Sequence, residues 1–126
     1  MKYTKFTGVE AEEIKGDVKG NVSGNVSGDV TGALKGGKSL SKSADYSLSA
    51  SEKAAPYVGV TLSAASKTVT LGLANGQVMI VANEGGTNAF TLKNVSGDSG
   101  TSMAAGKVAI VVGSTTANSS KVYVLN

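Results

Sequence analysis

Few side chains in this sequence could carry catalysis. The chain contains no histidine, cysteine or arginine, which excludes a Ser-His-Asp triad, a thiolate nucleophile and the zinc sites built from those ligands. One Ser-x-x-Lys sequence, Ser39 to Lys42, has the spacing of a serine nucleophile and its lysine base. It lies in a Ser- and Ala-rich stretch without an accompanying motif, so we assign it no catalytic role.

The carboxylates offer two further patterns. Glu84 and Asp98 could pair as acid and base for glycoside hydrolysis, but both lie in turn-like sequences, where acidic residues commonly serve solubility and Asx-turns. Asp17 and Asp29 do not have the spacing of a calcium-binding loop. The Gly-Asp-Ser-Gly sequence at 97–100 resembles a protease nucleophile motif, yet the chain has no histidine to serve as its base. We therefore expect no enzymatic activity, no cofactor and no metal.

Charge and hydropathy exclude other classes. The 126 residues carry 12 lysines against 9 acidic residues, for a net charge of +3. The lysines are scattered singly, whereas nucleic-acid binders cluster Lys and Arg. No apolar run reaches the length of a membrane span, and the N-terminal residues lack the apolar core of a signal peptide. We expect a protein that binds neither nucleic acid nor membranes and is made and used without export.

The most regular segment is a Gly-polar-Val-polar repeat at 16–37. From Gly16 to Gly36, small or apolar residues occupy every second position, and nearly every residue between them is polar. Because side chains alternate faces along a strand, the pattern predicts one Gly/Val face and one wetted face. The apolar positions, which we expect to mediate oligomerisation, are Val18, Val22, Val26, Val30 and Leu34.

A single chain cannot bury that Gly/Val face with one strand, and the strand's backbone groups also need partners. We therefore expect an extended stalk intertwined between subunits. Two alternatives stay open. Gly/Ser/Asn-rich segments are commonly flexible linkers, although a linker has no use for a β-branched residue at every fourth position. The second alternative is a β-helix formed within one chain, although the tract lacks the hexapeptide or nonapeptide period usual for that fold.

The rest of the chain divides into a neck and a β-domain. Residues 38–56 are rich in Ser, Ala and Lys and are predicted as a neck or linker. From 57 to 126, apolar and β-branched runs alternate with turn sequences. The predicted strands are 57–62, 67–71, 77–82, 89–95, 107–112 and 121–125. The expected fold is all-β, with the stalk followed by a small antiparallel β-sandwich or barrel.

Alternate apolar positions of those strands define the expected core. They are Val60, Leu62, Val69, Leu71, Val78, Ile80, Phe90, Leu92, Val108, Ile110, Val122 and Val124.

Two stretches resemble bacteriophage head-fibre and capsid-decoration proteins, or related short phage fibres. One is the Gly-Asp-Val-x-Gly-x-Val-x-Gly tract. The other runs from Gly76 to Val95 and is similar to the G-Q-x-x-x-I-x-N-x-G-x-x-x-[FI]-T-[LIV] pattern of small fibre β-domains. The resemblance implies a homotrimer fixed by its N-terminus to a virion, with the β-domain outward.

In this interpretation residues 1–15 form a virion-anchoring leader. Its large apolar side chains are the expected capsid-binding residues: Tyr3, Phe6, Val9 and Ile14. Alternatively, Tyr3 and Phe6 plug the base of the trimer. The expected function is that of a structural protein on the capsid surface, assembled in the host cytoplasm, with the major capsid protein or another virion scaffold as partner. The alternative is a receptor- or glycan-binding tail-fibre module that binds a bacterial surface glycan.

Overall fold

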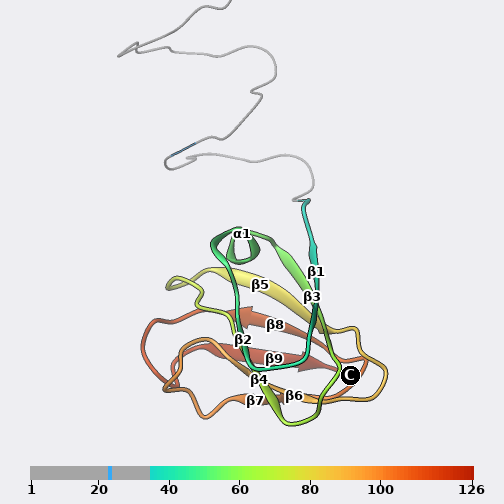
Figure 1. Ribbon diagram of the computed structural model, residues 1–126. Coiled ribbons are helices and arrows are strands. Elements are labelled where there is room, and N and C mark those ends of the chain that lie inside the picture. The colour runs from blue at the N-terminus through green and yellow to red at the C-terminus, as the bar shows by residue number, and fades with distance from the viewer. Residues whose placement is uncertain (1–22, 24–34) are drawn as a thin grey trace, which may run out of the picture. The chain divides into compact units, whose positions relative to one another are not determined.

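The computed structural model describes Ser23 and residues 35–126. The leader and nearly all of the repeat tract lie outside the described residues, so the expectations for them stay predictions. Those positions are the capsid-binding Tyr3, Phe6, Val9 and Ile14 and the oligomerisation residues Val18, Val22, Val26, Val30 and Leu34. The described part is almost entirely β-structure, which confirms the all-β prediction (Figure 1).

Nine strands and one short helix make up this part of the chain. The elements are β1 (Lys38–Lys42), β2 (Tyr46–Ser47), α1 (Ala50–Lys53), β3 (Tyr57–Leu62), β4 (Lys67–Thr70), β5 (Val78–Asn83), β6 (Phe90–Lys93), β7 (Thr101–Met103), β8 (Val108–Val112) and β9 (Lys121–Leu125). A five-stranded sheet has the order β1-β3-β5-β8-β9, and a four-stranded sheet has the order β2-β4-β6-β7.

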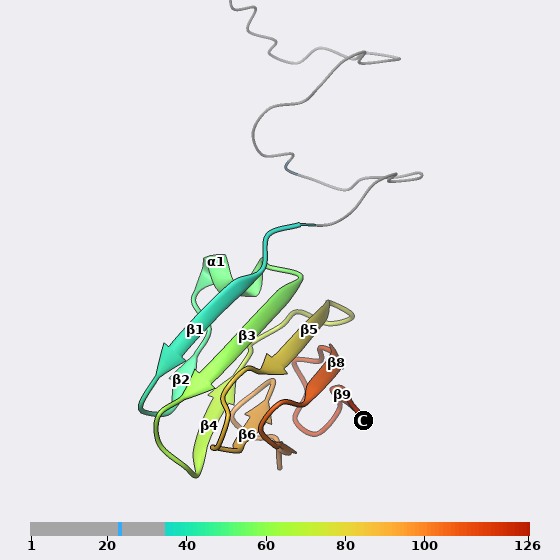
Figure 2. The same ribbon diagram turned by 90° about the vertical axis from the view of Figure 1, so that its right-hand side faces the viewer.

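The chain coils between the two sheets three times. Each of the pairs β1-β2, β3-β4 and β5-β6 gives one strand to each sheet, so successive coils stack in parallel (Figure 2). Twenty residues separate Leu40 from its partner Val60, and 23 separate Val58 from its partner Val81. After β6 the direction reverses, and β7, β8 and β9 join antiparallel to β6, β5 and β8.

Two predictions about the architecture are corrected. The prediction of two packed sheets holds, but that of an antiparallel arrangement or of a barrel is wrong, because both sheets are mixed and neither closes. The turn sequences do reverse the chain, but several of them carry it across to the other sheet, so the next strand in the same sheet arrives one coil later and in parallel. Residues 38–56, predicted as a neck or linker, contribute β1, β2 and α1, so the domain begins before Tyr57.

The core lies between the sheets, and half of its predicted positions are confirmed. The fully confirmed set is Val60, Leu62, Val69, Leu71, Phe90 and Leu92. Val122 is partly buried against the core, and Val124 on the last strand is 36% exposed.

In β5 and β8 the predicted phase is wrong by one residue. Met79 and Val81 are buried, whereas Val78 and Ile80 face outward; in β8, Ala109 and Val111 are buried in place of the predicted Val108 and Ile110. The runs from Val78 to Ala82 and from Val108 to Val112 are apolar at every position, so alternation could not indicate which face points inward.

Two buried asparagines stand where the parallel stacking ends. In the five-stranded sheet Leu40, Val60 and Asn83 are in register on neighbouring strands and form one inward-facing column. The side-chain amide of Asn83 forms hydrogen bonds with the backbone, whereas the other two side chains pack in or against the apolar core. Its Nδ2 donates to the carbonyls of Asn88 and Met103 at 2.8 and 2.9 Å. The amide thereby ties the end of β5 to the loop after it and to β7.

Asn94 does the same at the end of β6. Its Nδ2 donates to the carbonyls of Leu73 and Ser114, at 3.1 and 2.8 Å, and its Oδ1 accepts from the backbone N–H of Leu73 at 2.7 Å. The side chain therefore joins three segments that are distant in the sequence. Among the described residues, every buried side-chain nitrogen and oxygen has a hydrogen-bond partner.

Replacing Asn94 with Ala should lower the free energy of unfolding by about 3 kcal/mol, because the backbone groups of Leu73 lose their partners in a dry environment. The matched control is Asn75→Ala, which removes exposed bonds to Thr115 and should cost less than about 1 kcal/mol. Chemical denaturation measures both. Equal losses would contradict the role given to Asn94.

Candidate functional site

The outer face of the four-stranded sheet carries hydroxyl groups. Val69, Phe90 and Leu92 point inward, so the residues between them point to solvent. Cross-strand pairing aligns these outward residues in rows across the sheet. The rows are Ser47–Thr70–Lys93 and Thr68–Thr91–Ser102.

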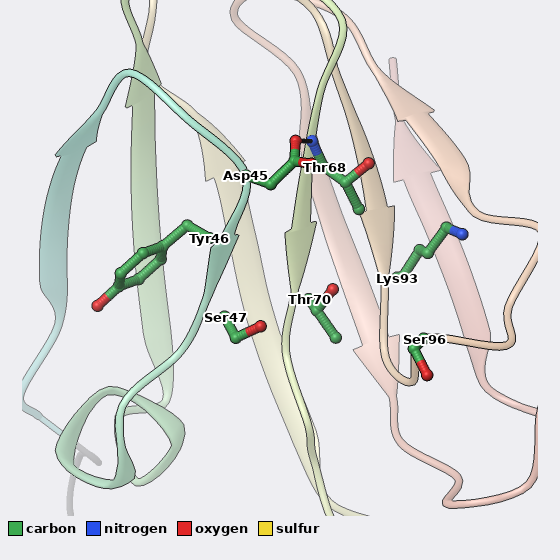
Figure 3. Close-up of a pocket in the computed structure, with 7 residues that line it drawn as sticks. All are labelled: Asp45, Tyr46, Ser47, Thr68, Thr70, Lys93 and Ser96. Carbon is green, nitrogen blue, oxygen red and sulfur yellow. Dashed lines mark hydrogen bonds between the residues drawn. The ribbon is translucent and has the colours of Figure 1, made fainter.

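An open groove of about 270 Å³ lies over this face. Its lining comes from β2, β4, β6 and the residues beside them, as Figure 3 shows. The lining residues are Asp45, Tyr46, Ser47, Thr68, Thr70, Lys93 and Ser96. Asp45 Oδ1 accepts a hydrogen bond of 2.9 Å from the backbone N–H of Thr68, which fixes the carboxylate at the rim.

The groove thus offers one carboxylate, one ammonium group and several hydroxyls. Such a set can donate to and accept from a polyhydroxylated ligand, and the ammonium group of Lys93 can pair with an anion. The aromatic ring of Tyr46 does not form the floor. It extends away from Lys93, and its hydroxyl donates to both carboxylate oxygens of Glu52 at 2.9 and 2.8 Å (Figure 3).

The Tyr46–Glu52 contact fixes the wall of the groove next to α1. Ser49 and Glu52 form a capping box around the start of this four-residue helix. Desolvation opposes ionisation of Glu52, but hydrogen bonds from Ser49 and Tyr46 outweigh it and lower its pKa. The same bond raises the pKa of Tyr46, and the ammonium group of Lys42 lies 4.1 Å from the centre of the Tyr46 ring.

A second, smaller groove of about 140 Å³ also has Lys93 in its lining, together with Asp98. The Asp98 carboxylate is buried, and both of its oxygens accept hydrogen bonds from the backbone. Its Oδ2 accepts from the backbone N–H groups of Asn94 and Val95 at 2.8 and 3.0 Å, and its Oδ1 accepts from that of Asn118 at 2.6 Å. Desolvation opposes the charge, but these backbone donors outweigh it and lower the pKa of Asp98.

The structure does not bring the candidate catalytic residues together. Ser39 and Lys42 lie on opposite faces of β1, because they are three positions apart on a strand. Glu84 binds the hydroxyl of Tyr57 at 2.8 Å and thereby raises the pKa of that tyrosine, whereas Asp98 binds loop backbone. Asp17 and Asp29 lie outside the described residues.

Sequence patterns alone do not identify the groove, although they indicate part of its lining. The alternation in 67–70 and 90–93 indicates outward-facing threonines and Lys93, but not that Asp45 and Ser47 lie beside them. That adjacency depends on stacking two coils, with Tyr46 in register with Val69.

Comparison of the chain with protein-family models, curated proteins and solved structures finds no match. The described part of the chain holds no cluster of three or more metal-ligating residues. It also has no helix long and apolar enough to cross a membrane.

The buried carboxylate of Asp98 predicts a pH-dependent stability. Because folding lowers its pKa below the ordinary 3.8, its contribution is present above that value and is lost as the pH falls through the folded-state pKa. Asp98→Asn should lower the free energy of unfolding at neutral pH by roughly 2 kcal/mol and flatten the pH dependence in this acid range.

Urea denaturation at neutral and acidic pH tests this. Asp45→Asn, which affects one exposed hydrogen bond, serves as the control and should change stability little. An unchanged acid dependence in Asp98→Asn would contradict the assignment.

Proposed function

We propose that this protein is a structural virion protein, a homotrimeric head fibre or decoration protein of a bacteriophage capsid. Its N-terminus attaches to the capsid and its β-domain points outward. The Gly-polar-Val-polar repeat at 16–37 carries the proposal. A single strand cannot bury its own Gly/Val face or pair its own backbone groups, whereas several copies of the chain can do both for one another.

The polar interior of the described domain supports a structural role. Asn83, Asn94 and Asp98 all bind backbone groups of their own fold. Such networks make a small domain rigid and define a single arrangement of its loops. A rigid module that displays its surface suits a fibre or decoration protein.

Deleting residues 1–14 tests attachment. In this function Tyr3 and Phe6 enter a pocket of the capsid, where each contributes about 2 kcal/mol or more. The truncated protein should keep its oligomeric mass by light scattering but no longer bind purified virions that lack the protein. The variant Lys2→Ala/Lys5→Ala, which leaves the apolar anchors in place, is the control and should still bind.

Two outcomes contradict this arrangement. Binding of the truncated protein at full strength would place the anchor elsewhere. Dissociation of the truncated protein into monomers would show that Tyr3 and Phe6 plug the base of the oligomer instead.

The groove beside Lys93 favours a second function, recognition of a bacterial surface glycan. Hydroxyls from Ser47, Thr68 and Thr70 line the same groove as the carboxylate of Asp45 and the ammonium group of Lys93 (Figure 3). A sugar that carries a carboxylate fits this set best, because Lys93 can pair with its charge while the hydroxyls and Asp45 bind its hydroxyl groups.

Titration of the full chain with glucuronic acid and with glucose, followed by NMR, tests this function. Glucuronic acid should bind more tightly, with shifts confined to the groove, and Lys93→Ala should abolish the preference. The control is Lys121→Ala, which changes a lysine on β9 outside the groove and should leave the preference intact. Equal binding of the two sugars, or a preference that survives in Lys93→Ala, would reject the glycan function.

A further inference from the structure

The outer face of the five-stranded sheet is divided into a polar and an apolar half. Over β1 and β3 it carries Ser39, Ser41 and Thr61. The Glu84 carboxylate also covers this half: it lies against Gly59, where any Cβ would displace it, and binds the hydroxyl of Tyr57.

Over β5, β8 and β9 the same face is largely apolar. We call this half the β5–β8–β9 face. Its apolar outward residues are Val78, Ile80, Val108, Ile110, Val112, Tyr123 and Leu125, and Lys121, in register with Val112, adds one charge at its border. Ile80, Ile110 and Tyr123 form one cross-strand row. Val78 and Tyr123 are 56% and 57% exposed, so this surface is open to solvent in the single chain.

Composition indicates that the β5–β8–β9 face has a cover. Strands buried on both faces are apolar at every position, whereas strands with one wetted face alternate. In this chain β4 and β6 alternate, with threonine and lysine outward, but β5 is apolar from Val78 to Ala82 and β8 from Val108 to Val112. The two kinds of strand stand in one small domain, so the difference is specific to this face.

The last strand gives a second, independent indication. β9 pairs with β8 and with no other strand in the described part of the chain, and the four-stranded sheet has no fifth strand opposite it. Val124, on the inner side, is therefore 36% exposed. The other edge of this sheet, β1, carries Lys38 and Lys42, which discourage pairing, whereas β9 has only Lys121 at its start.

The area of this surface indicates what covers it. Its most exposed side chains present a few hundred Å², the size at which apolar patches mark interaction sites. A stable complex between free partners needs about 800 Å² on each side. Copies of one chain that are joined elsewhere meet at effective concentrations of about millimolar, where a smaller apolar contact is sufficient.

We propose that the β5–β8–β9 face is the surface through which the C-terminal domains of neighbouring copies of this chain pack together. The inference rests on the proposed function, since the repeat tract is the segment that would join the copies. In the assembly Tyr123 and Ile80 lie against a second copy.

Single-cysteine variants of the full chain test the proposal, because the chain has no cysteine of its own. A short bis-maleimide should cross-link copies of Tyr123→Cys in high yield. Thr91→Cys, on the hydroxyl-rich outer face of the other sheet, is the matched control and should stay uncross-linked. Adding Ile80→Lys to Tyr123→Cys should lower the yield by about tenfold or more, because it places an unpaired charge in the contact. Adding Ser102→Lys, on the outer face of the other sheet, should not.

The other outcomes overturn either both proposals together or this inference alone. A monomeric full chain by light scattering would overturn both this inference and the proposed oligomer. An oligomer in which Tyr123→Cys cross-links no better than Thr91→Cys, or in which Ile80→Lys has no effect, would overturn the inference alone. A Tyr123→Cys that is protected from maleimide in a monomer would show that another segment of the same chain covers the face.

Discussion

The fold of the described domain depends on the parallel stacking of three coils and on how that stacking is stopped. Stacked coils bury one apolar column after another, but the last coil leaves its end open. Here the last coil carries two asparagines at the ends of its strands, Asn83 and Asn94, whose amides bind backbone carbonyls of the segments that turn back over them. A buried amide is tolerated only when its donors and acceptors are satisfied. These two side chains therefore hold the end of β7 and the segment that follows β8 against the last coil.

The sequence predicts the secondary structure better than the way it is assembled. The strand at 57–62 and the alternating runs at 67–70 and 90–93 are recognisable, because their β-branched and apolar residues alternate with polar ones. β1 and β2 are not, since their serines and lysines resemble those of a linker. Parallel pairing leaves no local trace: Val58 meets Val81 across 23 residues, and only the residue types of the column connect them.

The groove and the apolar face were unpredictable for related reasons. The groove combines Asp45 with Lys93, which approach each other only because three coils lie in register. The apolar face results from a phase that the sequence leaves undetermined, since Val78 and Met79 are equally suited to the core. Long-range register decides both. The two surfaces also lie on different sheets, so a polar ligand and a neighbouring copy would not compete for the same side chains.

The stacking also has a consequence for how such a chain can change in length. β3 and β4 form a coil whose neighbours on both sides are coils, and 23 residues separate equivalent positions from β3 to β5 and from β4 to β6. Units that contact only their nearest neighbours can be added or removed while the ends stay intact. A duplication of this unit would lengthen both sheets by one strand and leave the asparagine-capped end unaltered. Relatives of this domain could therefore differ in height by whole coils, while the surfaces built by the last strands stay the same.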